Sequence, residues 1–179
     1  MTEVGHVYGQ SLYELARDEN LGADIQQQLE SLRQSFQEAP EFLTLLSTPS
    51  LSKSERCQIL DESFRGNVHP YVLNFLKILT EKGYIRYFSD CCGAYTDSYN
   101  ADNGILPVTA VTAVPMRENQ AETLTRKLSA ITGKQIQLRR KIDPTVLGGI
   151  RLDYDGQRLD DTVSHRMDKL RDLLSKTVL

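Results

Sequence analysis

Apolar residues in the first hundred positions recur at steps of three and four, which is the spacing of an amphipathic helix. The first apolar stripe consists of Val4, Val7, Tyr8, Leu12, Leu15 and Ala16. The second follows Asp24, which we expect to cap a helix that buries Ile25, Leu29, Leu32 and Phe36. Because brief polar connections separate these stripes, the pattern predicts a bundle of five or six short antiparallel helices.

Residues with strong capping preferences mark several helix boundaries in this region. Pro40 and Pro70 suit the first turn of two further helices, because no backbone N–H is required there. Ser52-Lys53-Ser54-Glu55 is a capping box, in which the first and last side chains each bond to the other's backbone N–H. Gly83 suits the left-handed residue that ends the helix begun by Pro70. The last helix of the bundle carries Tyr84, Phe88, Cys91, Cys92, Tyr95 and Tyr99.

The periodicity changes after Ala101-Asp102-Asn103-Gly104. We interpret residues 101–104 as a hinge between an N-terminal helical unit, 1–100, and a C-terminal unit, 105–179. The change of period from helix to strand at one place is typical of a domain boundary.

The C-terminal unit begins with a strand, a helix and a second strand. Leu106 to Val114 is rich in Val and Thr and apolar on both faces, which predicts a covered strand. The helix that follows ends at Gly133 and carries Ala121, Leu124, Leu128 and Ile131. Gln135 to Ile142 alternates like a half-buried strand, and Arg140 on its apolar side is expected near an edge of the sheet.

The rest of the C-terminal unit predicts a hairpin and a final helix. Leu147 to Tyr154 is predicted to be a strand, and the Gly148-Gly149 pair within it indicates a bulge or a close backbone contact. Asp155-Gly156 is a strong two-residue turn signal. Asp160 or Asp161 is expected to cap a helix with Val163, Met167, Leu170 and Leu174 on one stripe. The predicted fold class is mainly α: a six-helix bundle followed by a small α+β domain of order β-α-β-β-β-α.

The net charge of −3 is unevenly distributed along the chain. Through Gly104 there are 8 Lys and Arg against 15 Asp and Glu, a formal −7, and from Ile105 onward 13 against 9, a formal +4. A change of sign at one place indicates two units with different partners. An excess of +4 is too small to predict a polyanion ligand, and the dense basic stripe of a nucleic-acid binder is missing.

No targeting or membrane-spanning segment is expected from the sequence. The first fifteen residues lack a basic region followed by an apolar run, and no stretch approaches the roughly 20 apolar residues that cross a bilayer. The three cysteines, Cys57, Cys91 and Cys92, fit no zinc-binding spacing. The favoured interpretation is reduced, buried thiols in an intracellular protein.

Recognisable motifs for catalysis, metal binding and cofactor binding are missing from the sequence. Gly148-Gly149 lacks the phosphate-loop and dinucleotide-binding patterns, and no serine lies in a G-x-S-x-G elbow. His6, His69 and His165 are far apart in the chain. We therefore expect no catalytic residue, no metal site and no cofactor.

One C-terminal stretch and two shorter N-terminal stretches of the chain resemble the ATP synthase delta family, whose mitochondrial member is called OSCP. Residues 141–152, then Asp155-Gly156, then 159–170 are similar to the family pattern D-x-x-[LIV]-x-G-G-[LIV], a hairpin, and D-x-[ST]-[LIV]-x-x-[RK]-[LIM]-x-x-[LM]. Residues 7–12 resemble the family's Y-A-x-A-L stretch, and residues 75–84, with Asn74 before them, resemble its N-F-L-x-x-L-x-x-x-x-R stretch. At the arginine position of that pattern this chain has Tyr84, and Arg86 comes two residues later. Gly9 and Ser11 stand where the family favours alanine.

The resemblance implies that the helical unit binds the N-terminal helix of an ATP synthase alpha subunit between its first and fifth helices. The candidate groove residues here are Tyr8, Ser11, Leu12, Leu15, Leu76 and Leu79. The alternative for each is burial in the bundle, which is favoured for Leu12 and Leu76. The small side chains of Gly9 and Ser11 would ease the close approach of a docked helix.

The resemblance also implies that the C-terminal unit binds the b-type helices of the peripheral stalk. The candidate residues are Arg139, Lys141, Arg166 and Lys169, whose charge suits acidic or amphipathic helix ends. Gly148, Gly149, Asp155 and Gly156 are expected to serve as structural turns. The implied function is a non-catalytic stator connector that links the catalytic head to the stalk during rotary, proton-driven ATP synthesis.

Because Met1 leads straight into the first helix, we expect a bacterial protein rather than a precursor with a transit peptide. Its expected place is the cytoplasmic face of the cell membrane, as a peripheral protein without direct insertion. Three alternatives stay open: a small RNA-binding protein with a KH-like C-terminal domain, an unrecognised enzyme on the helical bundle, and a generic scaffold adaptor. The RNA-binding alternative lacks the G-x-x-G loop that such domains need, and we expect no nucleic-acid partner.

Overall fold

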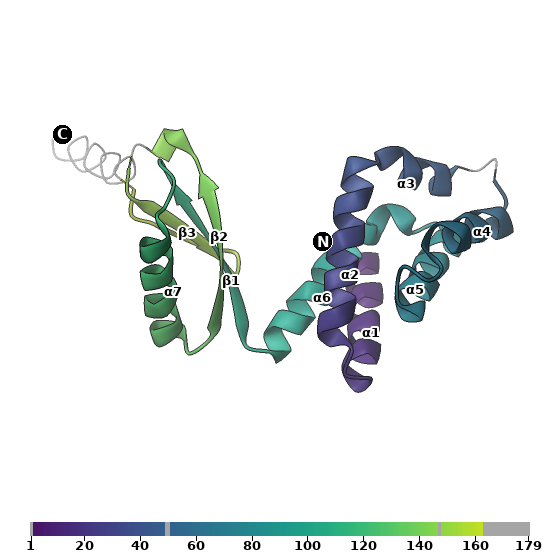
Figure 1. The fold of residues 1–179 in the computed structure, drawn as a ribbon, viewed down its shortest axis with the longest axis horizontal. Helices are drawn as coiled ribbons and strands as arrows, with labels where there is room; N and C mark the ends of the chain where they lie inside the picture. The colour runs from purple at the N-terminus through teal and green to yellow at the C-terminus, as the bar shows by residue number, and fades with distance from the viewer. Residues whose placement is uncertain (1, 49–50, 147, 163–179) are drawn as a thin grey trace, which may run out of the picture. The chain divides into compact units, whose positions relative to one another are not determined.

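The computed structural model of the chain describes residues 2–48, 51–146 and 148–162. The chain divides into two compact units, Met1–Tyr99 and Asn100–Leu179. The described residues of the first unit form helices joined by short connections, and a small sheet lies in the second unit (Figure 1). This mainly α fold with a C-terminal α+β part confirms the predicted fold class.

Six α-helices build the first unit, as the apolar periodicity predicted, and a single 3-10 turn precedes the last of them. Their bounds are α1 Glu3–Asp18, α2 Gly22–Glu38, α3 Pro40–Ser47, α4 Lys53–Phe64, α5 Pro70–Glu81, η1 Ile85–Tyr87 and α6 Phe88–Asp102. The structure contains the Ser52–Glu55 capping box at the start of α4. Pro40 and Pro70 occupy the first turns of α3 and α5.

The prediction that Asp24 caps the second helix is wrong. Helix α2 already begins at Gly22, and Asp24 lies within its first turn. The earlier start is supported by two contacts from other parts of the bundle: Leu21 N donates to Ala16 O, and Tyr95 Oη donates to Gly22 O at 2.9 Å. A carboxylate in the first turn is still favourable, because the helix dipole is positive there.

One aromatic cluster and one continuous apolar core hold the bundle together. The ring of Phe36 lies 5.8 Å from Phe42, 6.1 Å from Phe64 and 5.0 Å from Phe88, between ring centroids. These four side chains therefore join α2, α3, α4 and α6. The deepest core residues come from all six helices; they are Ala16, Ile25, Leu46, Leu60, Val72, Leu76, Leu79 and Tyr95.

Helix α1 packs against α6 at backbone distance because two glycines face that helix. A Cβ atom built on Gly9 would lie 2.3 Å from the carbonyl oxygen of Cys91, and one built on Gly5 would lie 2.5 Å from the Cβ of Asp90. The N-terminus of α1 is also tied to α6, since Thr2 N donates to Asp90 Oδ2 at 2.9 Å. Hydrogen bonds from Thr2 lower the pKa of the Asp90 carboxyl.

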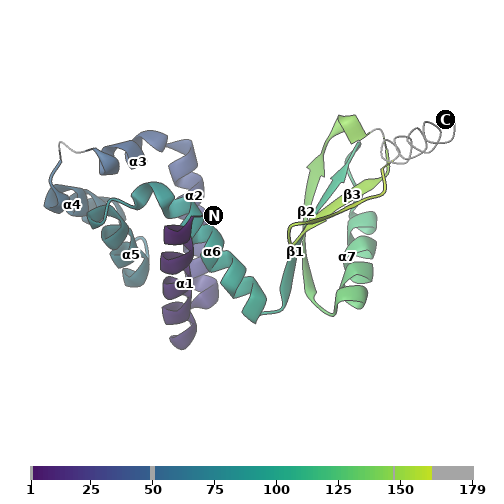
Figure 2. The same ribbon diagram turned by 180° about the vertical axis from the view of Figure 1, so that it is seen from behind.

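In the part that the structure describes, the second unit is a four-stranded sheet with one helix on a face. Its described elements are β1 Ile105–Thr112, α7 Glu118–Thr132, β2 Gln135–Ile142, η2 Pro144–Val146, β3 Ile150–Tyr154 and β4 Gln157–Asp160. The strand order is β2-β1-β3-β4; β1 is parallel to β2 and antiparallel to β3, and β3 is antiparallel to β4. Helix α7 lies along the sheet in both views (Figures 1 and 2), over a core of Val108, Ala110, Ile136 and Leu152.

Two boundaries in the second half of the chain differ from the prediction. Helix α6 continues through Asp102, so only Asn103 and Gly104 separate it from β1, where a four-residue hinge was expected. The strand predicted from Leu147 begins only at Ile150, because Gly148 and Gly149 have φ values of 128° and 83°, which a strand cannot accommodate. The predicted final helix lies outside the described residues.

Gly149 allows two chain segments to cross at the end of the sheet. A Cβ atom at this position would lie 2.5 Å from the carbonyl oxygen of Asp161 and 2.9 Å from the Cα of Thr162. The hairpin turn between β3 and β4 has positive φ at both central residues, 45° at Asp155 and 69° at Gly156, as a type I′ turn requires. Gly149 thus permits a close backbone contact, and Gly156 permits the hairpin turn.

Substituting Gly9 by alanine should destabilise the helical unit. Overpacking against the Cys91 carbonyl should cost about 1–3 kcal/mol and outweigh the gain of roughly 1 kcal/mol in helix propensity. The control is Gly22→Ala, whose Cβ would meet only the movable ring of Tyr99 at 3.3 Å. Urea unfolding followed by tyrosine fluorescence reports mainly on this unit, because Tyr154 is the only tyrosine after Gly104. Equal midpoints for the two variants would contradict the close contact.

Substituting Gly149 by alanine should destabilise the second unit and leave the first unchanged. The strain of a positive φ costs about 1–2 kcal/mol for a residue with a side chain, and the clash with Asp161 adds about 1–3 kcal/mol. Gly133→Ala is the matched control, because Gly133 has φ 68° and open space around its Cβ position. Hydrogen exchange of β3 amides should increase more in Gly149→Ala than in the control; the reverse order would refute this role.

Candidate functional site

A line of apolar side chains on α1 is exposed to solvent. Val7 is 54% exposed and Leu15 is 43% exposed, and the exposed residue Ser11 lies between them at helical steps of four. The Ser11 hydroxyl donates to the carbonyl oxygen of Val7 at 2.8 Å. The hydroxyl in this line therefore already has a hydrogen-bond partner within the helix. We call Val7, Ser11 and Leu15 the α1 stripe.

Three of the six predicted groove residues lie in the core instead. Leu12 is 5% exposed, and Leu76 and Leu79 are fully buried. For Leu12 and Leu76 this is the burial that the sequence favoured. Ser11 and Leu15 are exposed, and Tyr8 is half-buried beside them.

Two exposed apolar residues on α1 and α5 were not among the predicted groove residues. Val7 belongs to the α1 stripe, and Ile78 on α5 is 36% exposed. The signal for Val7 was present in the sequence, because the predicted apolar stripe of the first helix has more members than one buried face can hold. Ile78 could not be separated from its buried neighbours by periodicity alone.

The expectation that Gly9 eases the docking of a partner helix is wrong. Gly9 faces α6 and lies on the side of α1 opposite to Ser11. Its missing side chain is needed for the packing of the bundle itself. The α1 stripe therefore presents apolar and hydroxyl side chains, with no glycine among them.

Aromatic side chains connect α1 with the segment that follows α5. The rings of Tyr8 and Tyr84 meet edge to face at 5.9 Å, and the rings of Tyr84 and Tyr87 are 6.3 Å apart. The guanidinium of Arg86 lies 4.7 Å from the centre of the Tyr87 ring. Half-buried tyrosines offer a partner a rigid contact surface at low cost in side-chain entropy.

The second candidate surface is the face of the sheet that α7 does not cover. Arg139 pairs with Thr109 and Lys141 pairs with Val111 across the parallel strands. These positions alternate with Val108 and the other core residues under α7, so the two basic side chains point to the opposite face. Both are exposed, and neither has an ion pair with any residue that the structure describes.

The same sheet face carries further charged residues on β3 and β4. Asp153 accepts a hydrogen bond from Arg158 Nε at 2.8 Å, and Arg151 Nε lies 3.4 Å from its other carboxylate oxygen. The hydrogen bond from Arg158 is the main reason why the pKa of Asp153 is lowered. This face is therefore basic at Arg139 and Lys141 and charge-paired at β3 and β4. Arg166 and Lys169 lie outside the described residues.

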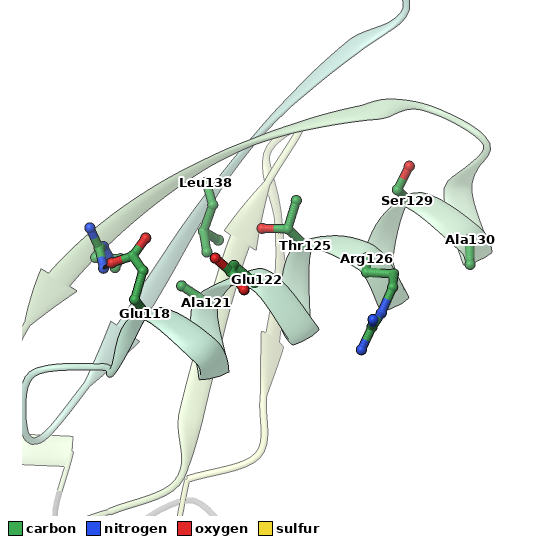
Figure 3. A pocket seen from close by; sticks show the side chains of 9 residues that line it. Glu118, Ala121, Glu122, Thr125, Arg126, Ser129, Ala130 and Leu138 are labelled. Carbon is green, nitrogen blue, oxygen red and sulfur yellow. Dashed lines mark hydrogen bonds and ion pairs between the residues drawn. The ribbon is translucent and has the colours of Figure 1, made fainter.

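Arg140 points to the other side of β2, where a shallow cavity of about 590 Å³ lies against α7 (Figure 3). Arg140 Nη1 bonds to Glu118 Oε2 at 2.7 Å, as suits a charged residue on an edge strand. Leu138 and Thr125 line the middle of the cavity, and Arg126 points away from Leu138 (Figure 3). The polar lining of the cavity comes from Glu118, Glu122, Thr125 and Ser129 together with the two arginines.

The cysteine thiols are poor nucleophiles in this environment. Burial raises the pKa of Cys91 to about 11 and raises that of Cys92 further. Cys57 is partly buried near Glu81, and its pKa is also raised. Among the described residues no group of His, Cys, Asp or Glu could hold a metal ion, and none of their helices is long and apolar enough to cross a membrane.

Comparison with known proteins places the whole chain in one family. The model of the ATP synthase delta (OSCP) subunit matches residues 4–174. The ATP synthase subunit delta of Alkaliphilus oremlandii (strain OhILAs) is 32% identical, over 96% of either chain. That of Clostridioides difficile (strain 630) is 30% identical, over 98% of this chain and 97% of the relative.

A solved structure shares the fold along almost the whole length. A chain in the cryo-EM structure of the Toxoplasma gondii mitochondrial ATP synthase hexamer superposes with a TM-score of 0.78 and 20% identity, covering 97% of this chain and 98% of that one. The chain described here belongs to the ATP synthase delta (OSCP) subunit family and is a component of an F-type ATP synthase.

Proposed function

We propose that this chain is the stator connector of its ATP synthase. The first unit binds the N-terminal helix of an alpha subunit in the catalytic head, and the second unit binds the b-type peripheral stalk. The connector holds the head against the torque of the rotating shaft, so that proton flow is coupled to ATP synthesis. It acts as a peripheral protein at the cytoplasmic face of the bacterial membrane and performs no catalysis itself.

The observation that carries this proposal is the exposure of Val7 and Leu15 on one line of α1. Because Val7 and Leu15 are already about half covered, burying the rest of each side chain under a partner would contribute about 1 kcal/mol, roughly half the value for a fully exposed side chain. Ile78 on α5 and the half-buried rings of Tyr8 and Tyr84 add apolar area for such a partner. Recognition would follow the helix-in-groove mode, in which apolar anchors at steps of three and four enter a complementary surface.

The second contact is supported by the charge of the sheet face opposite α7. Arg139 and Lys141 are exposed there, neither forms a salt bridge with a described residue, and the charge of Lys141 helps to lower the pKa of the Asp143 carboxyl. An acidic or amphipathic stalk helix would complement them, and such complementarity mainly improves specificity and the association rate. The proposed boundary between the two functions lies near residues 101–104, where Asn103 and Gly104 connect α6 to β1. Membership of the delta family argues against the RNA-binding alternative.

Replacing Leu15 by glutamine should weaken binding of the alpha-subunit N-terminal peptide about tenfold or more, because the anchor loses its apolar contact. Leu45→Gln on α3 is the matched control, since Leu45 is 42% exposed and also lies near the end of its helix. Calorimetric titration of the full chain with a synthetic peptide of the cognate alpha subunit measures both affinities. An equal loss in the two variants would contradict a specific role of the α1 stripe.

Replacing Arg139 and Lys141 together by glutamate should weaken binding of a soluble b-type stalk fragment about tenfold at low salt, and the loss should shrink as salt screens the charges. Arg126→Glu with Lys127→Glu is the control, because it changes the charge equally on the exposed side of α7. Surface plasmon resonance with the full chain would show the difference. If both double variants lose affinity equally, only net charge matters and the proposed face is wrong.

A further inference from the structure

The α1 stripe has an acidic border on one side. At about 100° per residue, Glu3 and Glu14 lie beside the line of Val7 and Ser11, on the side away from the core residue Leu12. Asp18 continues the line at the C-terminal end of α1. All three carboxylates belong to exposed residues.

Nearby basic groups neutralise this border only in part. Glu14 accepts a hydrogen bond from the neutral amide of Gln10 at 3.1 Å. Arg17 forms an exposed ion pair with Asp18 at 3.4 Å. On α5, Lys77 is engaged by Asp61 at 2.7 Å. The excess of acidic residues through Gly104, a formal −7, adds to the negative potential around the stripe.

We propose that the helix that docks on the α1 stripe carries lysine or arginine beside its own apolar stripe, on the side that meets Glu14 and Asp18. This inference rests on the proposed function of the first unit and specifies the chemistry of its partner. Apolar contacts supply most of the affinity, and the flanking charges select the helix and fix its direction, as the charged border positions of a coiled coil do.

The acidic border also disfavours a second copy of this chain as the occupant of the stripe. Two antiparallel α1 helices packed through Val7 and Leu15 would set their acidic borders side by side, with Glu3 of one copy near Asp18 of the other. Like charges facing each other across an interface oppose association. A partner helix with basic borders would instead be attracted to these carboxylates.

Reversing the charge of Glu14 tests the inference. In Glu14→Lys the affinity for the cognate alpha-subunit N-terminal peptide should fall about tenfold at low salt, and the difference should largely disappear at about 0.5 M salt because of screening. The matched control is Glu62→Lys on α4, because Glu62 is also exposed and also accepts from a glutamine amide four residues earlier, at 2.8 Å. Calorimetric titration of the full chain at several salt concentrations measures both variants.

The outcomes separate this inference from the proposed function. Weaker binding in Glu14→Lys alone supports the basic border on the partner. If wild-type protein binds the peptide and Glu14→Lys binds it equally well, the inference is overturned and the docking surface stands. If both lysine variants lose affinity equally, the effect comes from net charge and the local border is refuted. If the wild-type chain binds no peptide at any salt concentration, the proposed function itself fails.

Discussion

The contact of α1 with α6 at backbone distance fixes which side of α1 is exposed to solvent. Gly5 and Gly9 must face α6, because any side chain there would collide with Asp90 or Cys91. Helical geometry then places Leu12 and Ala16 in the core and turns Ser11 to the opposite side. The exposed stripe is thus a consequence of how the bundle is closed, and it persists only while the glycines keep the two helices together.

Helix boundaries could largely be predicted because they depend on local chemistry. The Ser52 capping box, Pro40 and Pro70 act within one turn of chain, and the structure contains each of these starts. Asp24 misled the prediction, because the true start of α2 is set by contacts from distant residues. The strand predicted from Leu147 failed for a related reason: hydrophobicity suited a strand, but the positive φ values at Gly148 and Gly149 do not.

Which side chains of the helical unit are exposed was harder to predict than the fold. Periodicity shows that a helix has an apolar side, but it does not show how much of that side its own bundle covers. Leu12, Leu76 and Leu79 satisfy the same spacing rules as Leu15 and yet lie in the core. Gly9 was assigned to the partner contact although it serves α6, since a glycine in a sequence carries no sign of the neighbour it accommodates.

In the proposed connector, the outward side of α1 touches the alpha subunit of the assembled complex. A photoreactive phenylalanine analogue placed at position 7, in whole ATP synthase purified from cells, tests this contact directly. After illumination, mass spectrometry of the cross-linked peptides should identify the N-terminal segment of an alpha subunit. Cross-links to a different subunit, or none although the complex is intact, would contradict the account.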